Sequence, residues 1–365
     1  MDGPEAREIF LVCQPVARTA DAGEQTEAIY RAALAVLEAE GGSFAAVVAE
    51  TLFLRSLRAD LELVRAARDR ILATCSAPHH RPAMTEIEQP PLSQRALEVS
   101  IQAVLPLPAG PPVRVDAFSQ ALRVQIGEEV RLYAGGLYGT GDAYQQTLTM
   151  FGVAEDLLQQ AGMEFRDVVR TWIHLREIDR DYADLNRARR AFFEARGIDP
   201  VPASTGVGGR LVPAGHDLCL GVYAVRAAAR KVMSTPLLND AASYGADFER
   251  GIRIAETNKV ALHVSGTASI DEAGRTVHPL EFEAQATRML QNVADLLTGQ
   301  GAGFDDVVSA ITYLRHPADL GRLRKKLHEA GFEGFPHALV AAPLCRSDLL
   351  CETEALAALP ISARS

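Results

Sequence analysis

The 365-residue sequence lacks paired cysteines, metal-ligand spacing and long apolar runs. Its five cysteines are odd in number and form no C-x-x-C pair, so reduced thiols are the simplest account of them. His79 and His80 are adjacent, not spaced to share a helix face, and no metal site is predicted. No apolar run approaches the ~18 residues that span a bilayer, and the acidic N-terminal residues do not resemble a signal peptide. We expect a cytoplasmic protein without metal or cofactor.

Basic residues are also fewer than acidic residues. Lysine and arginine total 37 against 47 acidic residues, which gives a formal net charge of −10. This balance argues against a nucleic-acid or anionic-membrane partner. If the ligand is an anion, local arginines must overcome the overall field.

The sequence does contain a threefold internal repeat. Phe44, Phe165 and Phe304 each begin the pattern F-x-x-V-V-x-x-x-x-x-L. A glycine stands three residues before each phenylalanine, a leucine seven before it, and a glutamine nineteen before it. These residues are Gly41, Gly162 and Gly301; Leu37, Leu158 and Leu297; and Gln25, Gln146 and Gln285. Coincidence at so many fixed offsets is improbable, so we predict three copies of one unit.

Each copy has the same order of expected elements. A strand is followed by an amphipathic helix, a glycine that ends it, an F-x-x-V-V strand, a second helix and a closing β-hairpin. The last hairpin is expected from Pro343 to Leu356, with a tight turn at 346–348. Units two and three also carry an extra leading strand. Linkers at 106–112 and 227–243 divide the chain into an abbreviated unit at 1–107 and full units at 113–228 and 236–360.

The repeat resembles the RidA/YjgF family, whose members have a chorismate-mutase-like α+β fold. Unit two fits its pattern best, at Asp179, Tyr182, Asn186 and Phe192-Phe193. Three such units associate into a closed trimer with ligand clefts between them. The resemblance therefore implies that this chain is a monomeric pseudo-trimer.

Many members of that family deaminate enamines and imines. An arginine before the closing strand anchors the substrate carboxylate in those enzymes. The equivalent positions here are Met84, Ser204 and His337, so the anchor is missing from all three units.

A narrower resemblance, to the chorismatases, covers units two and three. Five motifs occur in matching order: Y-x-x-[FL]-N-x-x-R at 182–189, T-x-V-G at 205–208, Y-G-x-x-F-x-R at 244–250, S-G-T-A-[AS] at 265–269 and C-R-x-[DE]-L-x-x-E at 345–352. The linker before Tyr244 lacks that family's arginines, and His337 replaces another expected arginine. The resemblance implies cleavage of the enolpyruvyl ether of chorismate, a small carboxylate, to pyruvate and 3-hydroxybenzoate or a dihydroxycyclohexadiene carboxylate.

Glu352 is the candidate proton donor for that reaction. Enol-ether cleavage needs a proton on the methylene carbon, and a carboxylic acid kept protonated by burial can supply it. Glu352 lies in a run typical of buried sheet, where strand alignment places Ser100 and Gly221 in the other units. The alternative is a structural edge-strand carboxylate. Cys345 is the second catalytic candidate, because the resemblance associates a cysteine there with 3-hydroxybenzoate formation; alternatively, it is a small buried apolar residue.

The substrate-binding candidates are Arg189, Arg250 and Arg346, together with Thr205, Tyr244 and Gly266. Guanidinium groups bind carboxylates through two parallel hydrogen bonds, and the three arginines lie in the matched motifs. Thr205 could donate to an oxyanion or only shape its loop, and Gly266 could admit a ligand or form a bulge. Three functions stay open: a chorismatase-like enzyme, a RidA-like deaminase or hydrolase, and a metabolite-binding pseudo-trimer without catalysis.

Overall fold

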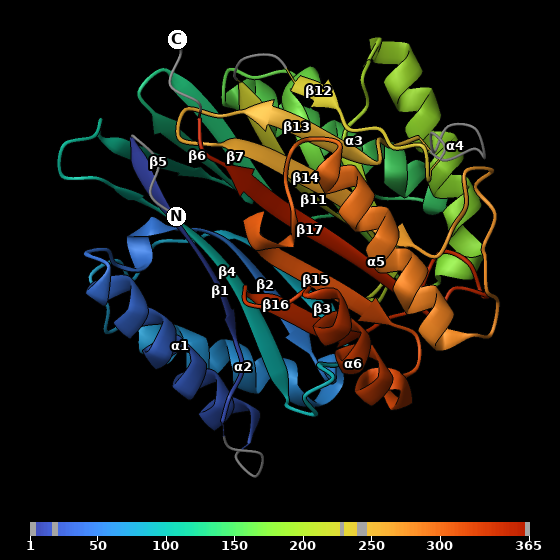
Figure 1. The fold of residues 1–365 in the computed structure, drawn as a ribbon. Coiled ribbons are helices and arrows are strands. Elements are labelled where there is room, and N and C mark those ends of the chain that lie inside the picture. The colour runs from blue at the N-terminus through green and yellow to red at the C-terminus, as the bar shows by residue number, and fades with distance from the viewer. Residues whose placement is uncertain (1–4, 17–20, 227–229, 239–246, 362–365) are drawn as a thin grey trace.

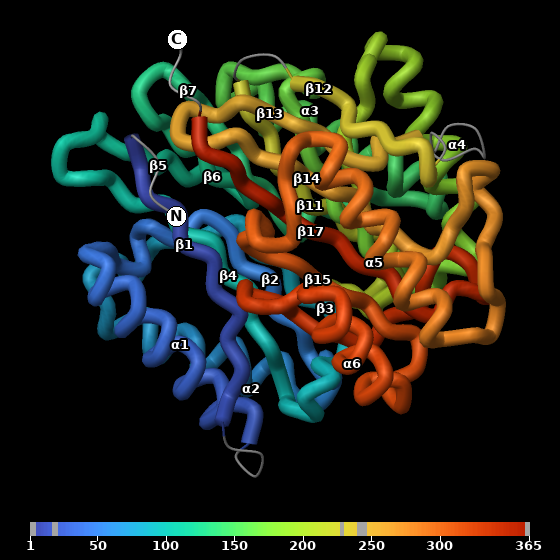
Figure 2. The backbone as a smooth tube through the Cα atoms, in the orientation of Figure 1, coloured from blue at the N-terminus to red at the C-terminus, as the bar shows by residue number. Residues whose placement is uncertain are grey.

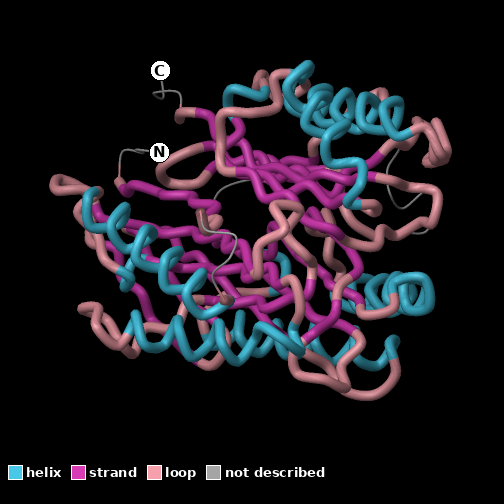
Figure 3. The backbone as a smooth tube through the Cα atoms, turned by 90° about the horizontal axis from the view of Figure 1, so that it is seen from below, coloured by secondary structure: helices cyan, strands magenta, loops and turns pink. Residues whose placement is uncertain are grey.

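The structure is a computed structural model that describes residues 5–16, 21–226, 230–238 and 247–361. Three β-sheets meet in the middle of the molecule, and each carries a pair of helices on its outer face (Figures 1 and 3). Each sheet with its two helices is one copy of the repeat. The predicted α+β pseudo-trimer of three tandem units is confirmed.

Unit one is the abbreviated copy. Its sheet has the order β1-β4-β2-β3-β10, and the short β10 is contributed by unit two. The elements are β1 (Ala6–Cys13), α1 (Ala22–Ala39), β2 (Val47–Leu54), α2 (Leu57–Leu72), β3 (Ala83–Glu88) and β4 (Leu97–Pro106), with β10 at Arg210–Leu211.

Units two and three each have a six-stranded sheet, in the orders β5-β6-β7-β11-β8-β9 and β12-β13-β14-β17-β15-β16. Unit two consists of β5 (Val113–Phe118), β6 (Ala121–Ile126), β7 (Glu129–Leu137), α3 (Ala143–Gln160), β8 (Val168–Leu175), α4 (Ile178–Arg196), β9 (Ala203–Gly208) and β11 (Leu218–Arg226). Unit three consists of β12 (Arg230–Val232), β13 (Gly251–Ala255), β14 (Val260–Ala268), α5 (Phe282–Thr298), β15 (Val307–Leu314), α6 (Leu320–Ala330), β16 (His337–Ala341) and β17 (Cys351–Leu359). Two extra leading strands, β5 and β6 in unit two and β12 and β13 in unit three, therefore come before the strand that leads into the first helix, where one extra strand was predicted.

The repeated glutamines explain part of the sequence pattern. The side-chain oxygen of Gln25 accepts a hydrogen bond from the Ala96 backbone N–H, just before the closing strand of unit one. Gln146 and Gln285 accept the corresponding bonds from the backbone before and at the start of the other closing strands. Each glutamine thus ties the first helix of its unit to the closing strand. The three repeated glycines all have positive φ, which a residue without Cβ adopts freely.

The predicted closing hairpin of unit three is wrong. β17 pairs with β14 on one side and β15 on the other, so no place in the ladder remains for a partner before it (Figure 2). Residues 343–350 instead form a loop that crosses to unit two. There Leu344 makes an isolated antiparallel bridge with Val207, and the Gly208 N–H donates to the Pro343 carbonyl at 2.7 Å.

The predicted alignment of Glu352 with Ser100 and Gly221 is also wrong. Glu352 pairs with Tyr313, the seventh residue of β15. The seventh residues of β2 and β8 pair with Glu98 and Cys219, so these two residues are the equivalents of Glu352. Ser100 and Gly221 correspond to Glu354 instead. The sequence pattern could not detect this two-residue slip, because side chains two apart lie on the same face of a strand.

A buried ion network joins the three units at one end of the interface. Arg131 of unit two is fully buried and binds Glu8 of unit one at 2.7 Å and Glu256 of unit three at 3.2 Å. Lys259 also binds both of these carboxylates. Burial by itself would raise the pKa of Glu8, but the two cations outweigh it and hold that pKa well below the usual range.

Candidate active site

A cleft of about 710 Å³ lies between units two and three. Unit two contributes one face of α4 and the inward edge of β9. Unit three contributes β14, the crossing loop and the first residues of β17. The side chains on which the site is built are Asp179, Tyr182, Asn186, Arg189, Arg190, Ser204, Phe248, Arg250, Gly266, Cys345, Arg346 and Glu352.

Glu352 lies on β17, is 4% exposed and lines this cleft. Burial and, to a lesser extent, the nearby carboxylate of Glu354 raise the pKa of its carboxyl group, and the net value is about 8. The arginines at positions 170, 250 and 346 act in the opposite direction without reversing the shift. Glu352 is therefore protonated at neutral pH and has a proton to donate into the cleft.

Gly266 makes room for that carboxyl group. It sits where the register between β14 and β17 shifts, so it forms a bulge, which was one of the two roles expected of it. A Cβ atom placed on Gly266 would lie 2.1 Å from Oε1 of Glu352. The absence of a side chain here is what lets Glu352 occupy its position on the cleft wall.

Two buried arginines face the cleft from its opposite units. Arg189 on α4 is 3% exposed, and Arg250 just before β13 is 5% exposed. The guanidinium groups of Arg189 and Arg250 lie 5.5 and 5.4 Å from the ring centroid of Phe248, so both are close to the same ring. Arg189 also donates to Asn186 Oδ1 at 2.6 Å, which fixes its orientation.

Arg189 reaches the position from which the expected carboxylate anchor is missing. Its Nη1 donates to Ser204 Oγ at 3.4 Å, and Ser204 is the unit-two equivalent of the anchor. A helix arginine thus brings positive charge to a place where RidA-like enzymes use a strand arginine. The missing anchor in the sequence does not leave this cleft without a cation.

The crossing loop supplies Cys345 and Arg346. Burial raises the pKa of the Cys345 thiol to about 12, and Glu352 adds to the shift, so the thiol is neutral. Tyr182 on α4 forms a hydrogen bond to it. Arg346 Nη1 donates to the Gly274 carbonyl at 2.7 Å, which holds the side chain against the cleft wall.

Thr205 lies behind the cleft. Its side chain is 1% exposed, and Oγ1 accepts hydrogen bonds from the Gly266 N–H at 2.9 Å and from Arg170. Arg170 in turn pairs with Glu354 at 2.9 Å, and Glu354 accepts a hydrogen bond from Trp172 Nε1 at 2.7 Å. Thr205 is not among the residues that line the cleft, and its hydroxyl contacts the strand that carries Gly266, so its contact with a ligand stays a prediction.

The structure brings together Glu352, Cys345, Arg189, Arg250, Arg346 and Gly266 in one cleft. Tyr244 lies outside the described residues. The prediction missed Tyr182, Asn186 and Phe248 as wall residues. Helical spacing carried a signal for two of them, because Tyr182, Asn186 and Arg189 lie at i, i+4 and i+7 on α4.

This arrangement can hold a dianion and protonate it. The cleft combines a neutral carboxylic acid with three arginines, and Arg190 at its rim pairs with Asp247 at 3.1 Å. Among the described residues, no group of three or more His, Cys, Asp or Glu side chains is placed to hold a metal ion. In the same part of the chain, no helix is both long and apolar enough to cross a membrane.

Comparisons with known proteins agree with this architecture. The family model for endoribonuclease L-PSP matches residues 119–226 and 246–359. A chorismatase from Streptomyces rapamycinicus is 28% identical over 255 residues, which are 62% of this chain and 73% of the relative. A 3-hydroxybenzoate synthase from Streptomyces hygroscopicus is 26% identical over 250 residues, or 60% and 72% of the two chains. The crystal structure of a chorismatase superposes with a TM-score of 0.67 at 17% identity, covering 96% of this chain and 98% of that one, which is a likeness of fold.

Proposed function

This chain belongs to the endoribonuclease L-PSP family, and on that premise we propose that it is an enzyme that cleaves the enolpyruvyl ether of chorismate. The proposed products are pyruvate and 3-hydroxybenzoate. The names of the two Streptomyces relatives support this choice of substrate and product. The observation that carries it is the buried carboxyl group of Glu352 in an arginine-lined cleft, where burial raises its pKa.

The proposed chemistry starts with proton transfer. Glu352 gives its proton to the methylene carbon of the enolpyruvyl group, and the C=C electron pair forms the new C–H bond. The ether oxygen stabilises the resulting oxocarbenium ion. Chorismate has the same composition as pyruvate plus 3-hydroxybenzoate, so that route consumes no water overall. Formation of a dihydroxycyclohexadiene carboxylate would consume one water molecule.

The charge of the cleft matches a dicarboxylate. Arg189 and Arg250 present buried guanidinium groups to the cleft, and a guanidinium group can bind a carboxylate through two parallel hydrogen bonds. Arg346 approaches from the crossing loop on the Glu352 side. With two carboxylates bound by guanidinium groups, the enol ether is placed between them and the acid.

Cys345 lies beside this acid as a neutral thiol and shapes the cleft without acting as a thiolate nucleophile. Its sulfur occupies space next to Glu352 that water would otherwise fill. We therefore assign it to product choice. Exclusion of water there favours the route that consumes none.

Incubation with chorismate tests the proposal. We expect pyruvate and 3-hydroxybenzoate to form in equal amounts, and the Glu352→Gln variant to form both about 100-fold or more slowly. The ring product separates the two routes, because 3-hydroxybenzoate is aromatic, whereas the dihydrodiol is not aromatic and is heavier by one water molecule. Failure to release pyruvate would contradict the proposal, and ammonia release from imines would favour the deaminase alternative. Ligand binding without turnover, unchanged in Glu352→Gln, would favour the non-catalytic alternative.

A further inference from the structure

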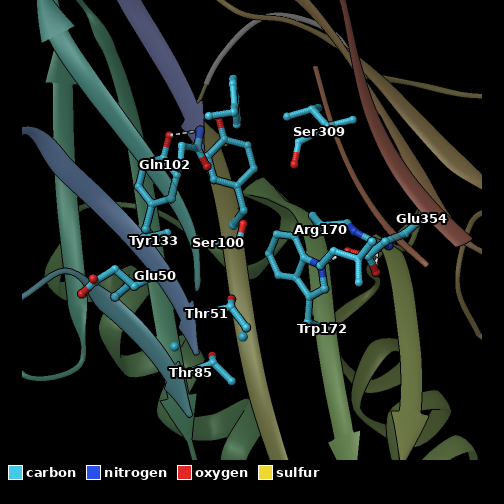
Figure 4. Close-up of a pocket in the computed structure, with 18 of the residues that line it drawn as sticks. Glu50, Thr51, Thr85, Ser100, Gln102, Tyr133, Arg170, Trp172, Ser309 and Glu354 are labelled. Atoms are coloured by element: carbon cyan, nitrogen blue, oxygen red, sulfur yellow. Dashed lines mark hydrogen bonds and ion pairs between the residues drawn. The ribbon is translucent and has the colours of Figure 1, made fainter. Parts of the chain in front are cut away.

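A second, separate cavity of about 160 Å³ lies where the three sheets meet. It is lined by strands of all three units, whereas the cleft described above is lined by units two and three. Figure 4 shows Thr51, Thr85, Ser100 and Tyr133 on one side of it and Arg170, Trp172 and Glu354 on the other. No step of the proposed reaction uses this cavity.

Hydroxyl groups without partners line the cavity. The side-chain hydroxyls of Thr51, Thr85 and Ser100 of unit one and of Ser309 of unit three make no hydrogen bond to other described residues. Thr85 is 8% exposed, so bulk water does not reach it freely. Buried hydroxyls in folded proteins almost always have a partner, either an ordered water molecule or a ligand.

Each charged group of the cavity wall has an ion-pair partner, although one guanidinium nitrogen does not. Arg170 pairs with Glu354 through Nη2, while its buried Nη1 makes no hydrogen bond to the described residues, and Lys259 pairs with Glu256. Glu50 pairs with Arg68, which lies behind the wall. A charged ligand would bring one uncompensated charge into this interior, which costs several kcal/mol. The lining therefore selects an uncharged molecule.

Aromatic side chains form another part of the wall. Trp172 is held in place by the hydrogen bond from its Nε1 to Glu354, and it is partly exposed to the cavity although it lies within the interface. Tyr133 packs against Tyr223, with ring centroids 4.9 Å apart. The volume is close to the ~150 Å³ of an engineered cavity in another protein that binds benzene.

We propose that this central cavity is a binding site for a small uncharged phenol. Its ring packs against Trp172 and Tyr133, and its hydroxyl group bonds with the free hydroxyls of Thr51 and Ser100. A single aromatic ring fits the volume, and one hydroxyl can both donate to and accept from those side chains. The residues that line this cavity are different from those that line the arginine-rich cleft.

Calorimetric titration of the full chain with phenol tests this inference. We expect saturable binding of one phenol per chain and a rise in Tm with phenol concentration. Ser100→Leu fills the cavity with an apolar side chain and is expected to raise the Kd for phenol at least tenfold. If circular dichroism shows that this variant is not folded, Ser309→Leu reduces the cavity from the opposite unit.

Two controls separate the cavity from the cleft. Benzoate has the same ring with a negative charge, so it should bind the cleft, and Arg346→Ala should weaken benzoate binding while leaving the Kd for phenol unchanged. Absence of saturable phenol binding would overturn the inference. So would phenol binding that weakens in Arg346→Ala but not in folded Ser100→Leu, because the phenol would then occupy the cleft. Loss of chorismate cleavage would bear on the proposed function alone.

Discussion

Glu352 and Gly266 share one space in the wall of the cleft: a Cβ atom on Gly266 would lie 2.1 Å from the Glu352 carboxyl oxygen. No unstrained heavy-atom contact is that short, so a side chain on Gly266 forces Glu352 to move. The position of the proposed acid therefore depends on a residue in the neighbouring strand.

We predict that Gly266→Ala lowers kcat/KM for chorismate by about 10- to 1,000-fold, since it displaces a general acid worth roughly 10² to 10⁴ in rate. Gly152→Ala is the matched control. Gly152 lies within α3 with no atom near the position of an added Cβ, so alanine should leave the activity unchanged and stabilise the helix by about 1 kcal/mol. Equal activity losses in both variants would contradict the proposed role of Gly266.

The pH dependence of kcat/KM should report the ionisation of Glu352. Its pKa is raised to about 8, and the protonated form is the active one, so kcat/KM should be high at pH 7 and fall as the pH rises through about 8. Glu352→Gln should lower kcat by about 10²-fold or more and abolish the fall of kcat/KM at high pH, which is the basic limb of the profile. A rate that increases between pH 7 and 9 would contradict general-acid catalysis by Glu352.

The repeat could be predicted from the sequence because its residues stabilise the fold within their own unit. Gln25, Gln146 and Gln285 bind the backbone at or just before the start of their closing strands, and the three repeated glycines have positive φ. These requirements recur in every unit, so they leave residues at fixed offsets. The cleft-facing side of α4, which carries Arg189, could likewise be predicted, because its residues recur at helical spacing.

Features that depend on contacts between units could not be predicted in this way. The crossing loop at 343–350 has apolar residues on both sides of a polar turn, as a hairpin does, but its Leu344 pairs with Val207 of another unit. Trp172 is typical of a core residue in its own strand, and it lines the central cavity because three units meet there. Glu98 was overlooked because a two-residue slip placed Ser100 in its position.

Glu98 is the unit-one equivalent of Glu352, and its buried carboxyl group lowers the stability of the folded protein. The side chain is fully buried, neither carboxyl oxygen makes a hydrogen bond of acceptable geometry to the described residues, and burial raises its pKa to about 8. Glu98→Leu should therefore increase the free energy of unfolding by about 1 to 3 kcal/mol at pH 7.

The gain should grow with pH. Because the folded-state pKa of Glu98 is raised above the unfolded value, this acid contributes a stability term that is lost as the pH rises from about 4.5 to about 8. Urea denaturation at pH 5, 7 and 9 measures this gain as the difference in the free energy of unfolding between Glu98→Leu and the parent protein. Glu62→Leu, at an exposed acid, is the control and should change stability by no more than about 0.5 kcal/mol. A loss of stability in Glu98→Leu at pH 9 would show that the acid has a partner.

The ion pair of Arg170 and Glu354 should tune Glu352 in two opposite directions. Glu354 raises the pKa of Glu352 and Arg170 lowers it. Glu354→Gln should therefore move the basic limb of kcat/KM below pH 8, and Arg170→Met should move it above. Either change leaves one buried charge without its partner and should cost about 3 to 5 kcal/mol of stability. General damage to the fold would shift both limbs in the same direction or lower the rate at every pH, so the sign of the two shifts distinguishes electrostatic coupling from damage. Identical limbs in both variants would show that the pair does not act on the proposed acid.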